Sequence, residues 1–172
     1  MATYKLISSV TVGSGGAATI DFTSIPQTYT DLVVKISSRD ASTGEWNNLD
    51  FRINGISTSV YSAMTVYGVG NGTGVGSETN YSAGARTYSQ GNGTTASIFG
   101  NVEFYFPNYT SSTHKSVSVD YVSENNATAA IAGFNAVRMA NTSAITSLSF
   151  YARDASNLLQ YSTAYLYGIS NA

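Results

Sequence analysis

The sequence predicts an all-β protein, an antiparallel sandwich of two sheets, and three observations carry this prediction. Apolar and polar residues alternate with period two over short stretches that are rich in Val, Ile, Thr, Tyr and Phe. Clusters of Gly, Asn, Ser and Asp separate these stretches at short intervals. The apolar spacing of an amphipathic helix is almost absent. About nine short strands joined by turns are typical of a sandwich, and their unequal lengths favour a jelly-roll-like arrangement over a barrel.

The first half of the chain contains four clear strand patterns and one weaker pattern. The expected strands are residues 4–12, 18–22, 31–38 and 48–53, with a further short strand at residues 63–67. Leu32, Val34 and Ile36 share one face of the third strand, and Pro26 interrupts the chain before it. The fourth strand ends at Asn54-Gly55, a dipeptide that favours a tight hairpin turn.

The second half of the chain contains five more strand patterns. The expected strands are residues 97–106, 115–122, 129–139, 145–152 and 162–169. The strand at 129–139 carries Ile131, Phe134 and Val137 as its apolar residues. We expect the last two strands to pair with each other, because they follow one another across the short turn at residues 154–157.

The alternating pattern stops between residues 68 and 95, where Gly, Ser, Thr and Asn dominate. Residues 68–76, for example, have the sequence GVGNGTGVG. Loops longer than about 12–15 residues inside a compact domain are usually functional or mobile. The chain of 172 residues is close to the usual size of one domain. The sequence therefore predicts a single β-sandwich domain over residues 1–172 with a long loop at about 68–95.

Composition narrows the class of function more than it narrows the fold. Only 10% of the residues are charged, against roughly 25% in an average soluble domain. Copies of a protein with so little surface charge repel one another only weakly. Such a surface suits a protein that packs against neighbouring proteins or contacts sugars. The net charge of −2 and the scattered basic residues argue against nucleic-acid binding. With no apolar run of about 18 residues, neither a membrane span nor a secretory signal is expected.

Two further compositional features bear on chemistry and assembly. The chain has no cysteine, which excludes disulfides, thiolate nucleophiles and cysteine-based metal sites. It has only two prolines, so the edges of its sheets lack one of the usual protections against pairing with another chain. Edge pairing or burial in a homo-oligomer is therefore expected.

Candidate catalytic and metal-binding residues are few. His114 lies in a polar connection with no nucleophile motif beside it, and a solvated loop histidine is the favoured interpretation. Asp50 and Glu103 form either a glycosidase-like carboxylate pair or, as we favour, outward strand residues paired with Arg52 or a lysine. Asp40 and Glu45 share an acidic, turn-rich segment with Asp50, but the spacing of a calcium-binding loop is missing. We expect no catalytic residue, no cofactor and no metal.

One polar segment is a candidate for ligand or partner contact. Trp46 is the sole tryptophan, and it is followed by Asn47 and Asn48 in an apparent loop. Asn71 and Tyr81 lie in the glycine-rich segment and complete the candidate interface loop. Aromatic faces with amide and hydroxyl partners form adaptable contact surfaces, as in lectins. The competing interpretation, which we favour, is that most of the thirteen tyrosines pack at a core edge or a subunit interface.

Three blocks of sequence carry a resemblance to a known group of proteins. They are residues 49–62 (LDFRING followed by STSVYS), residues 99–109 (FGNVEFYFPNY), and residues 141–150 with 162–169. In this order they resemble a group of virion structural proteins of tailed bacteriophages, common in marine phages and cyanophages. The resemblance covers most of residues 30–170 and implies a β-rich component of a phage particle, with no catalytic residues to carry over.

The expected function is therefore structural and not enzymatic. We expect a capsid decoration or cement protein, located in the virion after assembly in the host cytoplasm. Its partners would be the major capsid protein or other virion proteins and further copies of itself, with a trimer as the expected oligomer. The alternative is a tail-fibre or tail-tip module that contacts surface glycans of the host through the Trp46 segment and the long loop. A polysaccharide-degrading enzyme is a third hypothesis, and it depends on Asp50 and Glu103 facing one cleft.

Overall fold

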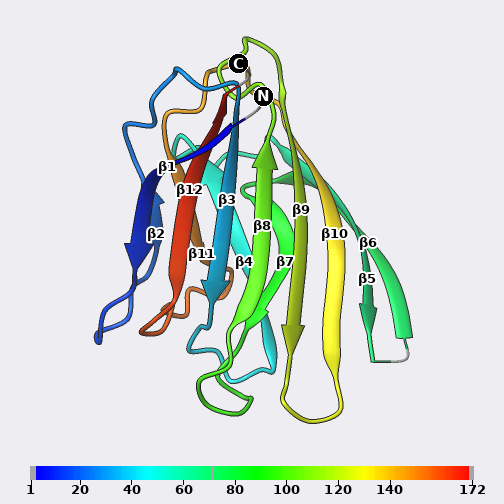
Figure 1. The fold of residues 1–172 in the computed structure, drawn as a ribbon. Helices are drawn as coiled ribbons and strands as arrows, with labels where there is room; N and C mark the ends of the chain where they lie inside the picture. Colours follow the sequence, from blue (N-terminus) through cyan, green and yellow to red (C-terminus); the bar gives the residue numbers. More distant parts are fainter. Residues whose placement is uncertain (1–2, 71, 171–172) are drawn as a thin grey trace.

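The protein is an antiparallel β-sandwich of two sheets, as the sequence predicts (Figure 1). The computed structural model describes residues 3–70 and 72–170. Twelve strands are found in these residues, against the nine or ten expected. In spatial order, the larger sheet contains β1 (Thr3–Thr11), β12 (Thr163–Ser170), β3 (Asp31–Ser38), β8 (Gly100–Phe106), β9 (Lys115–Glu124), β10 (Ala130–Met139), β5 (Tyr61–Val69) and β6 (Gly72–Tyr81). The smaller sheet contains β2 (Ile20–Phe22), β11 (Leu148–Ala152), β4 (Trp46–Ile53) and β7 (Gly84–Gln90). β6 and β7 are the strands that the sequence does not predict.

Most connections carry the chain from one sheet to the other. From β2 to β5 each successive strand lies in the opposite sheet, and the chain crosses again before β7, β8, β11 and β12. A jelly roll uses this kind of alternation, but its standard form has eight strands, whereas the larger sheet alone has eight strands here. The jelly-roll detail therefore stays a prediction. The described residues contain no helix long and apolar enough to cross a membrane.

Two predicted pairings are wrong because local turn signals do not determine sheet membership. Asn54 and Gly55 both adopt the left-handed conformation of a tight turn, with φ of 52° and 67°. The turn nevertheless joins β4 of the smaller sheet to β5 of the larger sheet and forms no hairpin. Likewise β11 and β12 do not pair, since β12 lies between β1 and β3 in the larger sheet.

The prediction of a long loop at about 68–95 is also wrong. β5 and β6 pair across Gly70, whose φ is 54°, and β7 forms an edge of the smaller sheet. Glycine makes these strands possible, because aromatic rings occupy the space where side chains would stand. A Cβ atom on Gly74 would lie 2.5 Å from the ring of its cross-strand neighbour Tyr67. The side-chain alternation by which a strand is recognised is therefore missing from the sequence.

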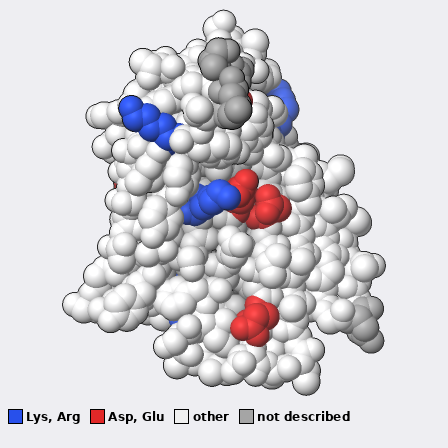
Figure 2. Space-filling model, in the orientation of Figure 1, with Lys and Arg blue, Asp and Glu red and all other residues white. Residues whose placement is uncertain are grey.

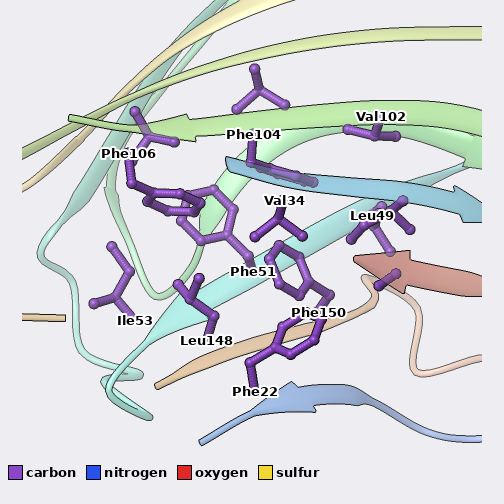
Figure 3. Close-up of a cluster of buried hydrophobic side chains, with 14 of the residues drawn as sticks. Phe22, Val34, Leu49, Phe51, Ile53, Val102, Phe104, Phe106, Leu148 and Phe150 are labelled. Carbon is purple, nitrogen blue, oxygen red and sulfur yellow. The ribbon is translucent and has the colours of Figure 1, made fainter. Parts of the chain in front are cut away.

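The core lies between the sheets and is built around a phenylalanine cluster (Figure 3). Phe51 of β4 packs edge to face against Phe104 and Phe106 of β8, with ring centroids 5.4 Å and 5.7 Å apart. Phe150 of β11 lies 4.9 Å from Phe104 and completes the cluster from the smaller sheet. The alternating apolar residues of strands β3, β4 and β9 are all buried, which confirms the shared face expected for β3. They are Leu32, Val34, Ile36, Leu49, Phe51, Ile53, Val117, Val119 and Tyr121.

Candidate functional site

Trp46, Asn47 and Asn48 lie in β4, so the prediction that they form a loop is wrong. They pair with the last three residues of β7, Tyr88–Gln90. The Trp46 ring is partly buried against the hydrophobic core. Asn47 Nδ2 donates a hydrogen bond of 2.7 Å to Asp154 Oδ1. The sequence resembles a loop here because polar residues occupy a strand whose inner face is covered only from Leu49 onward.

The rest of the predicted segment does not form an open site. Asn71 lies outside the described residues. Tyr81 is the last residue of β6, and its ring centroid lies 4.9 Å from the Arg153 guanidinium carbon. Arg153 in turn holds Asp50 with two hydrogen bonds of 2.9 Å and 2.8 Å, and its backbone N–H donates to the Asn48 carbonyl. The structure thus brings Tyr81 close to β4, but as part of a packed ion-pair cluster.

Asp50 and Glu103 do not face a common cleft. Leu49 and Phe51 flank Asp50 and point into the core, so Asp50 projects from the outer side of the smaller sheet. By the same alternation Glu103 projects from the outer side of the larger sheet, where its Oε2 lies 2.7 Å from Lys35 Nζ. The two carboxylates therefore leave the sandwich on opposite sides. Both are outward strand residues, as favoured, and Glu103 pairs with a lysine, whereas the basic partner that the structure shows for Asp50 is Arg153 and the sequence suggested Arg52. The glycosidase-like pair is wrong.

The other candidate chemical groups are also separated from one another. His114 Nδ1 lies 3.2 Å from an Arg138 nitrogen in an exposed position. Asp40 accepts a hydrogen bond from the Ser42 backbone N–H, whereas Glu45 accepts one from Asn125 Nδ2. Among the residues whose side chains the structure describes, no three His, Cys, Asp or Glu gather in a group that could hold a metal ion.

Three loops form a rigid platform at one end of the sandwich, at the bottom of Figure 1. We call this the loop end, and it comprises residues 39–45, 91–99 and 153–162. Backbone N–H groups of residues 91–93 donate to the carbonyls of Glu45, Ser42 and Gly44 in turn. Ala41 N–H donates to Asn157 O, and the third loop returns a bond from Leu159 N–H to Arg39 O. Because these loops hold one another, their side chains are presented in fixed positions.

Arg39 is the central residue of the loop end and is only 4% exposed. Its Nη1 and Nη2 atoms donate to the backbone carbonyls of Thr94, Thr95 and Ile98 and to side-chain oxygens of Asn92 and Thr94. Every one of these acceptors is neutral, and no carboxylate among the described residues forms an ion pair with Arg39. Arg39 is one of the scattered basic residues of the sequence, and nothing in its neighbours along the chain indicates that it is buried.

Asp40 follows Arg39 in the chain and makes the stability of the protein depend on pH. Burial raises the pKa of the fully buried Asp40 carboxyl above its ordinary value of 3.8. The folded state therefore binds this proton more tightly than the unfolded state, and the Asp40 contribution to stability falls as pH rises from 3.8 through the raised pKa.

We expect Asp40→Asn to match or exceed the parent protein in free energy of unfolding at neutral pH, because the amide keeps the Ser42 hydrogen bond without a buried charge. Urea unfolding of both proteins between about pH 4 and pH 7 measures the difference. That difference should shrink toward low pH, and a variant that loses stability only at neutral pH would contradict the assignment.

The outer face of the larger sheet exposes an unusual number of apolar side chains. We define the apolar face as Met64, Val66, Val75, Val122 and Phe134, which are between 47% and 80% exposed. They come from β9, β10, β5 and β6, which are adjacent strands. Phe134 lies opposite Val66, and Val66 lies opposite Val75, so these three side chains form one row across the sheet. This row lines a surface hollow of about 700 Å³, and Met64 lines a second hollow of about 670 Å³.

One feature of the sequence could have revealed the apolar face. Phe134 is out of phase with Ile131 and Val137, which are buried, and so it must leave the other side of β10. Asn135 takes the inward position beside it. Period-two alternation was sufficient to find the strand, but an apolar residue in the wrong phase indicates an outer face that is not fully solvated.

A small charged cluster lies beside the apolar face. Lys35, Glu103 and Asp120 are cross-strand neighbours of β3, β8 and β9, and Asp120 lies opposite Phe134. The hydrogen bond to Glu103 raises the pKa of Lys35, and burial together with nearby Glu103 raises the pKa of Asp120. Other charged side chains are sparse on this side of the molecule, which faces the viewer in Figure 2. The apolar face is therefore bounded by one compact polar group.

Comparisons of this chain with family models, with curated proteins and with solved structures found no match.

Proposed function

We propose that this chain is a structural protein of a bacteriophage virion, which decorates the assembled shell and stabilises it through the apolar face. The exposed apolar row of Phe134, Val66 and Val75 is the observation that carries the proposal. Large exposed apolar patches on soluble proteins mark interaction sites. The low charge of the chain and its resemblance to phage structural proteins support the same conclusion, and viral capsid domains include two-sheet sandwiches.

Binding through this face needs no chemistry beyond burial of apolar surface. Removing apolar area from water contributes about 25 cal/mol per Å². The row is held on a sheet whose strands pair along their whole length, so little order is lost on binding. A regular shell presents many equivalent sites, and an oligomer, with a trimer as our expectation, would engage several at once and raise the effective affinity.

The first test is the copy number of the protein in purified parent particles, measured by quantitative mass spectrometry against the major capsid protein. We expect a simple stoichiometric ratio between the two proteins. A handful of copies per particle would contradict decoration and favour a tail-fibre or tail-tip role. Absence from the particle would overturn the virion proposal altogether.

A surface variant tests the role of the apolar face directly. We expect the double substitution Val66→Thr, Phe134→Ser to abolish binding to empty shells, because it removes the centre of the apolar row. Its thermal stability should stay close to that of the parent protein, since both side chains are exposed. Tyr165→Ser on β12 is the matched control, an exposed residue of the same sheet that the charged cluster separates from the apolar face, and it should bind normally. Shell binding that survives the double substitution would contradict the proposal.

A further inference from the structure

The loop end contains a hollow that the proposed function does not use. Its volume is about 490 Å³, within the roughly 300–1,000 Å³ typical of small-molecule sites. It lies between residues 14–16, the 91–99 loop and residues 157–161. Asn92, Ser97, Asn157 and Tyr161 contribute amide and hydroxyl groups to its wall, and Phe99 contributes a second aromatic ring. Amides and hydroxyls both donate and accept hydrogen bonds, and this combination with aromatic faces matches a sugar better than an apolar ligand.

Beside the hollow, the backbone adopts an energetically unfavourable conformation at a residue whose aromatic side chain is exposed to solvent. Tyr161 has φ of 72° and Ser97 has φ of 66°, the left-handed region that bulky residues rarely adopt. Such conformations persist only where surrounding structure holds them. Here Tyr161 N–H donates to Val12 O, and the next residue bonds back to Leu159 O. The Tyr161 side chain is 66% exposed at the rim of the hollow, so packing of the core does not account for its position.

The charge of the hollow is positive. Arg39 is the one charged residue among the described residues that line it, and no carboxylate is present in the wall. The oxygens that hold Arg39 are neutral, so its positive charge is solvated but not cancelled. A charge in a partly buried, low-dielectric position acts more strongly on a ligand than the same charge in water. The hollow therefore favours a ligand that carries a negative charge.

We propose that this hollow binds a saccharide that carries a carboxylate. The sugar ring would pack against Tyr161, its hydroxyls would bond to Asn92 and Asn157, and its carboxylate would lie on the Arg39 side. Of the residues in this proposal, only Asn92 falls in the segments that the sequence predicts for glycan contact, which are the Trp46 segment and residues 68–95. The inference stands on the loop end alone and does not depend on the apolar face or on a virion location.

An NMR titration of the isolated, full chain tests the inference, with tetragalacturonate as the acidic probe and maltotetraose as the neutral probe. We expect tetragalacturonate to shift backbone resonances of the loop end and to bind at least tenfold more tightly than maltotetraose. Tyr161→Gly should weaken tetragalacturonate binding at least tenfold, whereas Tyr161→Phe should retain it. Glycine tolerates the positive φ at this position, so loss of binding by this variant would not reflect unfolding.

Tyr165→Gly provides a matched control on the larger sheet, away from the hollow, and should bind tetragalacturonate like the parent chain. Equal affinity for the acidic and neutral probes would overturn the assignment of an acidic ligand. No shift at the loop end, or full binding by Tyr161→Gly, would overturn the site itself. A negative result for saccharide binding would not contradict shell binding through the apolar face, because the shell-binding assay tests a different surface.

Discussion

Phe51→Ala is expected to lower the free energy of unfolding by about 3–5 kcal/mol, among the largest effects of any single substitution in this protein. The Phe51 ring is fully buried and contacts aromatic rings from both sheets, including Phe104 and Phe106 of β8 and Phe150 of β11. Gly84 of β7 also packs against it, since a Cβ atom there would lie 2.4 Å from the ring. Because rigid strands surround the ring on every side, the structure cannot collapse to fill the cavity.

Urea unfolding followed by fluorescence of Trp46, the sole tryptophan, measures this effect. The expected loss corresponds to a fall in Tm of about 6–20 °C for a domain of this size. Phe134→Ala removes the same ring from an exposed position and should cost less than about 1 kcal/mol. If the two substitutions lower the free energy of unfolding equally, the ring cluster in Figure 3 is not the centre of the core.

Arg39→Met is expected to cost about 3 kcal/mol and to loosen the 91–99 loop, because each hydrogen bond to a charged donor contributes roughly 1.5–3 kcal/mol and several are lost together. The methionine fills much of the space but leaves the carbonyls of Thr94, Thr95 and Ile98 without their donor. Arg39→Lys keeps the charge but not the planar, forked donor arrangement, so an intermediate loss is expected.

Hydrogen exchange of the loop amides separates this local effect from global destabilisation. Relative to the parent protein, Arg39→Met should accelerate exchange of the 91–99 loop amides more than exchange of the amides of β3 and β8. β3 and β8 pair with each other in the centre of the larger sheet. Arg138→Met is the matched control, because Arg138 is exposed and its guanidinium lies against the exposed loop residue His114 and not against buried carbonyls. It should change stability by less than about 0.5 kcal/mol. Uniform faster exchange, with no excess in the loop, would show that Arg39 does not organise the loop end.

The candidate sites show what sequence patterns can and cannot reveal. Outward strand positions were predictable for Asp50 and Glu103, because alternation alone places them opposite their buried neighbours. Their partners Arg153 and Lys35 lie 103 and 68 positions away along the chain, as the residue numbers show. The aromatic and amide residues at Trp46–Asn48 suggested a contact loop, but pairing with β7 makes them part of a sheet. The hollow beside Arg39 is lined by four segments that lie far apart in the sequence. No sequence pattern within any one segment indicates that they meet.

The sequence by itself determined the all-β class, the limits of most strands and the inward residues of β3, β4 and β9. These properties follow from side-chain alternation and turn chemistry, which act between residues close along the chain. Only the tertiary structure decided which sheet each strand joined, how the glycine-rich segment became β6 and β7, and where Arg39 and the apolar face came to lie. Those outcomes depend on contacts between residues far apart in the sequence, such as the Phe51 ring over Gly84 and the carbonyls of the 91–99 loop around Arg39. A period-two pattern contains no information about such partners, because it repeats identically on every strand.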